Sequence, residues 1–224
     1  MKSVILAGGM GTRMEDICKD IPKPLLPIDE KKLIDFAIEL SLSLSLEPLV
    51  VLGYKNDVLK RYLEEKWKDI KHITAIHKFK DLTLSLKAAE FYINEDFIWM
   101  GADTVFLDKE KIKRLINQNK GTKRFGLFYC ISDKFTPKIT LGGDNKVLDF
   151  NVEGTSGSNL SSPTIFISSK EIFSFITEGD NRNLINTLIK NNWNVYGLEY
   201  PSEKVLEVNT PQQYSELLQT FHRF

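Results

Sequence analysis

Short runs of apolar residues alternate along the chain with segments in which apolar residues recur every three or four positions. Apolar runs between turn residues are typical of strands buried on both faces, and the longer spacing is typical of helices. The pattern predicts strands over residues 4–7, 49–52, 72–77, 97–100, 125–131, 164–167 and 193–200. It predicts helices over residues 32–45, 56–67, 82–93, 108–119, 169–177 and 183–191, and a last helix that begins at Pro211.

Three segments depart from this simple alternation. Residues 138–141 and 146–152 flank the turn Gly142-Gly143-Asp144-Asn145, which predicts a β-hairpin. Serine and leucine alternate over residues 41–46, so a strand fits this stretch as well as the end of a helix. Residues 154–163 are rich in Gly, Ser, Asn and Pro and are expected to form a loop.

The order of the elements predicts the fold class. Strands alternate with helices and one hairpin is inserted, so we expect an α/β protein with Rossmann-like three-layer α/β/α architecture. Its mixed, mostly parallel sheet should be covered by helices on both faces. No linker, internal repeat or low-complexity segment divides the chain, which predicts a single domain over residues 1–224.

Composition excludes several classes of protein. Of 224 residues, 42% are hydrophobic and 27% charged, which argues against a disordered chain. The 30 basic and 30 acidic side chains cancel, whereas a general nucleic-acid binder needs a basic excess. Cys18 and Cys130 form neither a zinc-binding pair nor a disulfide framework, which favours a reducing compartment. Apolar runs are too short for a signal peptide or a membrane helix, so we expect a cytoplasmic protein without a membrane partner.

Two cationic segments are candidates for binding phosphate. The first is Gly8-Gly9-Met10-Gly11-Thr12-Arg13, directly after the first predicted strand, where ligands bind in open α/β sheets. Its glycines allow backbone N–H groups to approach an anion, and Arg13 adds a bidentate cation. The second is Lys23, whose backbone is fixed by Pro22 and Pro24. Taken alone, each segment also fits a turn or stiff loop that binds nothing.

The two segments together resemble the signature of the sugar-1-phosphate nucleotidyltransferases, L-A-G-G-M-G-T-R followed by P-K-P-L-L-P-I. The resemblance continues through residues 32–38 and 50–54 and through residues 207–214, which are similar to the closing motif D-I-G-T-P-E-D-Y of that family. It covers nearly the whole chain and is weakest over residues 120–165. No hexapeptide repeat follows Tyr214, so the C-terminal left-handed β-helix of some relatives is not expected.

The resemblance implies the nucleotide-diphospho-sugar transferase fold and a Mg²⁺-dependent reaction. A phosphomonoester such as a sugar 1-phosphate would attack the α-phosphorus of a nucleoside triphosphate (NTP) and expel pyrophosphate. Because both reactants are anions, catalysis would consist mainly of positioning and charge neutralisation.

The resemblance also implies roles for individual residues. Arg13 would hold the β- and γ-phosphates, and Lys23 would neutralise the α-phosphate. Asp103 and Glu207 would hold Mg²⁺, although an acid at a strand end is also a routine helix cap. Asp103 would belong to the nucleotide site as well, whose other residues would be Leu6, Ala7, Gly8, Gly9, Met10, Gly11 and Thr12. The three histidines fit no metal or triad spacing and are interpreted as structural: His72, His77 and His222.

The acceptor half of the family pattern is altered in this chain. A glycine-rich segment, G-T-A-G-A-L, is replaced by residues 81–86, and the lysine of an E-K-P motif is missing at 152–155. The asparagine expected before the next strand is replaced within residues 161–164. Phosphocholine and inositol-phosphate cytidylyltransferases share the front motifs and tolerate such changes, so an alcohol phosphate is an alternative acceptor. The sequence does not fix the base, the acceptor or the oligomeric state, and a homo-oligomer is compatible with it.

Three other functions compete with this interpretation. A non-catalytic nucleotide-sugar sensor would keep the fold and lose turnover, which the altered acceptor motifs allow. A glycosyltransferase of similar fold would need a D-x-D metal motif, but Thr104 and Val105 follow Asp103. A molybdenum-cofactor guanylyltransferase would suit Asn209-Thr210-Pro211, but its first loop lacks the G-x-G-T-R form.

Overall fold

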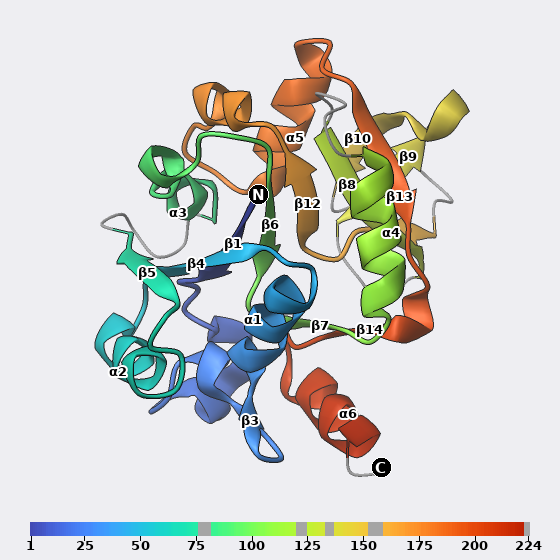
Figure 1. Ribbon diagram of the computed structural model, residues 1–224. Helices are drawn as coiled ribbons and strands as arrows, with labels where there is room; N and C mark the ends of the chain where they lie inside the picture. The colour runs from blue at the N-terminus through green and yellow to red at the C-terminus, as the bar shows by residue number, and fades with distance from the viewer. Residues whose placement is uncertain (76–81, 120–124, 133–136, 152–158, 222–224) are drawn as a thin grey trace.

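The computed structural model describes residues 1–75, 82–119, 125–132, 137–151 and 159–221, and these form a ten-stranded mixed sheet (Figure 1). Its parallel part runs in the order β5 (Lys71–Thr74), β4 (Glu47–Leu52), β1 (Lys2–Ala7) and β6 (Phe97–Gly101). Next, β12 (Ile165–Ser168) is antiparallel to β6 and to β8 (Phe125–Ile131). The strand β13 (Val195–Glu199) also pairs with β8, in parallel. The predicted mixed α/β sheet is confirmed.

The inserted hairpin is also confirmed. It consists of β9 (Lys138–Leu141) and β10 (Val147–Asn151), which are antiparallel and lie at the far edge of the sheet. Asp144 and Asn145 in the turn have φ values of 55° and 57°, a conformation that Asp and Asn tolerate. Within the predicted loop 154–163, residues 159–163 are described, and they contain the short strand β11 (Leu160–Ser161) between β8 and β9.

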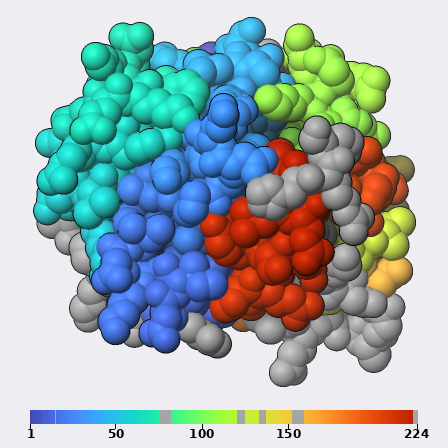
Figure 2. Space-filling view, turned by 90° about the horizontal axis from the view of Figure 1, so that it is seen from below, coloured from blue at the N-terminus to red at the C-terminus, as the bar shows by residue number. Residues whose placement is uncertain are grey.

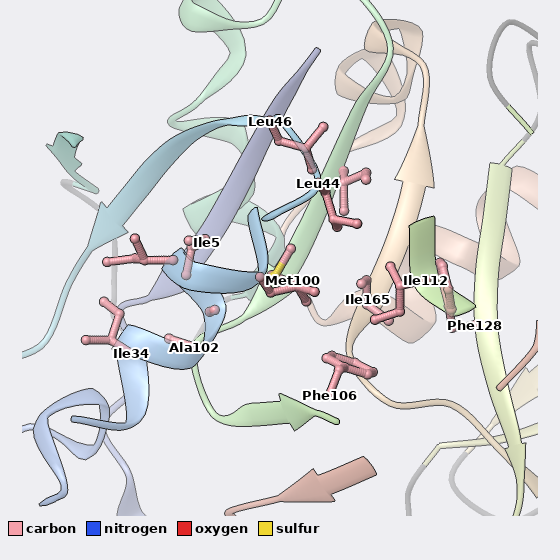
Figure 3. Packing of buried hydrophobic residues seen from close by; sticks show 14 of the residues in the cluster. Ile5, Ile34, Leu44, Leu46, Met100, Ala102, Phe106, Ile112, Phe128 and Ile165 are labelled. Atoms are coloured by element: carbon pink, nitrogen blue, oxygen red, sulfur yellow. The ribbon is translucent and has the colours of Figure 1, made fainter. Parts of the chain in front are cut away.

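Helices cover both faces of the sheet, as the sequence pattern predicts. One face carries α1 (Leu33–Ser43), α2 (Asn56–Lys66) and α4 (Lys109–Asn119). The other carries α3 (Leu82–Lys87), α5 (Asn181–Lys190) and the 3₁₀ helix Lys170–Phe175. Successive residues of β1 alternate between the two cores, because strand side chains point to opposite faces. Ile5 packs with Met100 on the α1 face, as Figure 3 shows, whereas Val4 packs on the other.

Two predicted helices are shorter or tighter than expected. The predicted helix 82–93 ends at Lys87, and a 3₁₀ turn follows over Glu90–Tyr92. The segment predicted as helix 169–177 is a 3₁₀ helix throughout.

The serine–leucine stretch resolves as the end of a helix. Over residues 41–43, α1 continues in place of a strand, and Ser41 Oγ donates to the Ala37 carbonyl at 2.9 Å. Ser43 Oγ likewise donates to the Leu40 carbonyl at 2.7 Å. The helix stops there, and Ser45 takes a φ of 56° before β4 begins.

The last part of the chain packs against the first. Strand β14 (Val205–Glu207) pairs antiparallel with β7 (Thr104–Phe106), and α6 (Pro211–Phe221) packs beside the small hairpin of β2 (Pro27–Ile28) and β3 (Lys31–Lys32). Figure 2 shows the surface of α6 (red) directly beside that of the N-terminal segment (blue). A third, smaller core joins these parts through Met14, Leu26, Val208 and Leu217. No helix in the described part of the chain has the length and apolarity needed to cross a membrane.

Candidate active site

The glycine loop after β1 is shaped by a close backbone approach. The Tyr54 amide donates to the Gly8 carbonyl at 3.0 Å, and a Cβ atom on Gly53 would lie 2.5 Å from the Gly8 Cα. Gly11 then takes a φ of 64° and starts the 3₁₀ helix Thr12–Cys18, whose Met14 is fully buried. These constraints fix the turn and leave Arg13 exposed at its surface.

Lys23 is held by three oxygen atoms from distant parts of the chain. Its Nζ atom lies 2.5 Å from Asp103 Oδ2, 2.9 Å from the Val208 carbonyl and 3.2 Å from Asn209 Oδ1. The 3₁₀ turn Lys23–Leu25, entered from the extended Pro22, sets the direction of the side chain, which is only 12% exposed. The ammonium group is therefore fixed before any ligand binds.

Asp103 and Glu207 are brought together by the β7–β14 pair. Glu207 is opposite Thr104 in the register, and the Val208 amide donates to the Asp103 carbonyl at 2.9 Å. Glu207 is buried, and this burial, together with the negative charge of Asp103, raises its pKa to about 8. The positive charges of Lys23 and Arg13 and a hydrogen bond with the Asn209 side chain lower the pKa of Glu207, but by less than burial and Asp103 raise it.

One cleft of about 300 Å³ collects most of the predicted site residues. Its lining includes the charged side chains Arg13, Lys23, Asp103 and Glu207, and also Leu6, Ala7, Gly9, Gly11 and Thr12. Gly8 and Met10 are not among the described residues that line it. Arg13 and Lys23 face each other closely, because an Nη atom of Arg13 donates to the same Asn209 Oδ1 atom at 2.9 Å.

Sequence reasoning gave no role to several residues that line the cleft. Asn209 stands inside the closing motif, so its position was visible but its contacts were not. Asn181 begins α5 and is 9% exposed, and Thr164 precedes β12. Together with Leu82 and Pro137, these two residues are uncharged members of the cleft lining. No motif in the sequence marks Asn181 as part of a site, whereas Thr164 belongs to the altered acceptor motif at residues 161–164.

Several predictions lie partly or wholly outside the described residues. These are the altered motif at 152–155, Asp81 at the start of residues 81–86, and the two histidines His77 and His222. His72 lies on β5, with its Nε2 atom 4.0 Å from Glu64, and does not line the cleft. The described remainder of the G-T-A-G-A-L counterpart, residues 82–86, forms nearly all of α3.

A metal ion would have to rely on few protein ligands here. The described part of the chain contains no cluster of three or more His, Cys, Asp or Glu residues suited to a metal. Asp103 and Glu207 are two neighbouring carboxylates, one of them buried at the cost of a raised pKa. Such a pair fits Mg²⁺, which takes one or two carboxylates and completes its shell with water and substrate phosphates.

The fold and the site define a nucleotidyltransferase-type domain. Residues 3–152 match the MobA-like NTP transferase domain, and the chain belongs to this family. The predicted resemblance to nucleotidyltransferases and the predicted α/β fold are thereby confirmed.

Named relatives activate different phosphate acceptors. The chain is 26% identical over 183 residues to the D-glycero-alpha-D-manno-heptose 1-phosphate guanylyltransferase of Campylobacter jejuni, covering 77% of this chain and 78% of that protein. It is 24% identical over 233 residues to the choline-phosphate cytidylyltransferase of Streptococcus pneumoniae, covering 97% and 96%. The solved inositol-1-phosphate CTP transferase of T. maritima superimposes with a TM-score of 0.78 at 16% identity, covering 98% of this chain and 95% of that one.

Proposed function

We propose that this protein transfers a nucleoside monophosphate from an NTP to a phosphomonoester and releases pyrophosphate. The observation that carries the proposal is the convergence of Arg13 and Lys23 with Asp103 and Glu207 in one cleft. Asp103 lies between β6 and β7, and Glu207 ends β14 more than a hundred residues later. The two cations come from two separate 3₁₀ segments. A binding site for a triphosphate with a divalent cation accounts for all four side chains.

The two cations would divide the triphosphate between them. Arg13 is exposed at the mouth and suits the β- and γ-phosphates, and afterwards the departing pyrophosphate. Lys23 is deeper and already oriented, so it suits the α-phosphate, where negative charge changes during the reaction. No protein nucleophile is needed, because the acceptor phosphate supplies the attacking oxygen.

Asp103 and Glu207 would hold Mg²⁺, the cofactor we propose. The burial of Glu207 beside a second carboxylate supports this assignment, because a divalent cation relieves the repulsion that raises its pKa. Held by Asp103 and Glu207, such an ion would supply positive charge that offsets the charge of the phosphates.

The uncharged residues that line the cleft indicate which kind of phosphate acceptor fits it. Asn181 and Thr164 offer an amide and a hydroxyl, both suited to hydrogen bonds with hydroxyl groups. Among the described residues that line the cleft, the cations are Arg13 and Lys23. The near full-length similarity to a choline-phosphate cytidylyltransferase favours an alcohol phosphate as second candidate beside the sugar 1-phosphates.

A pyrophosphate-release assay tests the proposal. The protein is incubated with Mg²⁺, each of the four NTPs, and a panel containing glucose 1-phosphate, a heptose 1-phosphate, inositol 1-phosphate and choline phosphate. We expect pyrophosphate with one NTP and one acceptor class, and loss of this activity with EDTA. Nucleotide or product binding without pyrophosphate from any pair would favour the sensor and contradict the proposal.

A further inference from the structure

The guanidinium group of Arg13 has a single anchor in the described part of the protein. Its Nη2 atom donates to Asn209 Oδ1 at 2.9 Å, and no carboxylate of the described residues pairs with it. Arg13 is also exposed, so packing does little to restrict its rotamers. The direction in which this cation points therefore depends on one amide group.

Asn209 is itself held rigidly. Its backbone amide donates to Gln213 Oε1 at 2.7 Å, and the next amide, that of Thr210, donates to the same atom at 3.1 Å. The contact with Gln213 ties the residue to the first turn of α6. On its other side it follows β14, which carries Glu207.

The same amide oxygen also accepts from Lys23 at 3.2 Å, so it bridges the two cations. In the closing motif D-I-G-T-P the corresponding position is glycine, which has no side chain. The D-I-G-T-P motif therefore does not require the amide, although Asn209-Thr210-Pro211 also suits the molybdenum-cofactor guanylyltransferases.

We propose that Asn209 is a positioning residue that orients Arg13 for the triphosphate through a neutral acceptor. The inference rests on the proposed function and adds a residue to its binding machinery. A carboxylate at this position would also orient Arg13, but it would form an ion pair with it, and the triphosphate would have to break that pair. An amide directs the guanidinium and leaves its charge available for phosphate.

The orientation of the Lys23 ammonium group should depend much less on Asn209 than that of the Arg13 guanidinium group. It keeps its contacts with Asp103 and with the Val208 carbonyl when the amide is removed. The effect of a substitution at Asn209 is therefore expected on NTP binding, through Arg13, more than on turnover.

Binding of inorganic tripolyphosphate, measured by isothermal titration calorimetry, tests the inference without knowledge of the base. The proteins are wild type, Asn209→Ala, Asn209→Asp, Arg13→Ala and the double variant Arg13→Ala/Asn209→Ala. Asn191→Ala, which removes an exposed amide bonded only within its own helix, is the matched control. We expect roughly tenfold weaker binding for Asn209→Ala, the usual effect of one hydrogen bond to a charged group. Asn209→Asp should bind more weakly still, although its side chain has nearly the same shape.

The double variant shows whether Asn209 acts through Arg13. If it does, adding Asn209→Ala to Arg13→Ala changes the affinity less than twofold. With the substrates found in the pyrophosphate assay, Asn209→Ala should raise KM for the NTP roughly tenfold and lower kcat less than threefold.

The outcomes separate this inference from the proposed function. Equal tripolyphosphate affinity of wild type, Asn209→Ala and Asn209→Asp would overturn the role of Asn209 and leave the nucleotidyltransferase proposal standing. Fully additive losses in the double variant would also overturn it. If the wild type itself does not bind tripolyphosphate, the proposed triphosphate site is wrong, and the inference is wrong with it.

Discussion

In the free protein, one carboxylate and two further oxygen atoms fix the ammonium group of Lys23. Little free energy is therefore needed to orient this group during the reaction. We predict that Lys23→Ala lowers kcat by roughly 10²–10³, the usual loss for one preorganised charge stabiliser. Steady-state pyrophosphate release measures this loss. The control is Lys60→Ala, on a surface pair with Glu64. A Lys23→Ala variant as fast as the control would show that the ammonium group does not act on the α-phosphate.

Glu207 should make the free protein less stable as the pH rises. Its pKa is about 8 in the folded state and near 4.5 in an unfolded chain, so the folded state holds a proton that the unfolded state has released between these values. Glu207→Gln removes this dependence. In EDTA at pH 8, the free energy of unfolding of the variant should exceed that of the wild type by roughly 1–3 kcal/mol, and this difference should shrink towards pH 5.

Thermal melts over this pH range measure the difference. Glu203→Gln, at an exposed position, is the control. Parallel pH profiles for wild type and Glu207→Gln would show that Glu207 ionises as an ordinary carboxyl group.

At the residue scale, the candidates found from sequence were those that stand in contiguous motifs. Arg13 and Lys23 belong to short segments rich in Gly and Pro, and their cleft position follows from these segments. Asn181 was missed because it reaches the cleft only through the packing of α5 against α3. The bond from Arg13 to Asn209 joins residues 196 positions apart, which no local pattern encodes.

The two loops that follow β1 and β4 depend on each other. Gly8 and Gly53 approach so closely that a Cβ atom on Gly53 would overlap the backbone of Gly8 at 2.5 Å. We predict that Gly53→Ala destabilises the protein by about 1–3 kcal/mol, the usual effect of overpacking, because one loop must move. Gly9→Ala is the matched control, since no atom lies within 4 Å of its added Cβ. Equal urea midpoints for the two variants would contradict this account.

Long elements were predictable from sequence, and short ones were not. The strands and helices with clear periodicity are present, including the hairpin β9–β10. The pairs β2–β3 and β7–β14 were missed because two or three residues are too few to show a period of two. The strand β14 matters most, because its pairing with β7 brings Glu207 to Asp103.

At the scale of the whole molecule, the cleft draws on parts of all three cores. Leu6, Met14 and Ala102 belong to different cores, and each lies in or beside a loop or strand end that lines the cleft. A bound nucleotide therefore stabilises the entire fold. We predict that the correct NTP, supplied with Mg²⁺ at a concentration about 100 times the Kd of the NTP, adds ~2.7 kcal/mol to the free energy of unfolding. This gain raises Tm by roughly 5–10 °C. A thermal-shift series with the four NTPs would identify the base, and no shift with any of them would contradict the triphosphate site.

The pairing of β14 with β7 has a consequence for the making of the protein. Arg13 and Lys23 are synthesised before the residues that hold them: Asn209 accepts from both cations, and the Val208 carbonyl accepts from Lys23. Domains begin to fold during synthesis, from the N-terminus. A nascent chain that has grown only through residue 152, the end of the family match, lacks the acceptors at 207–209. The two cations are therefore oriented only after residues 207–209 have been made and β14 has paired with β7.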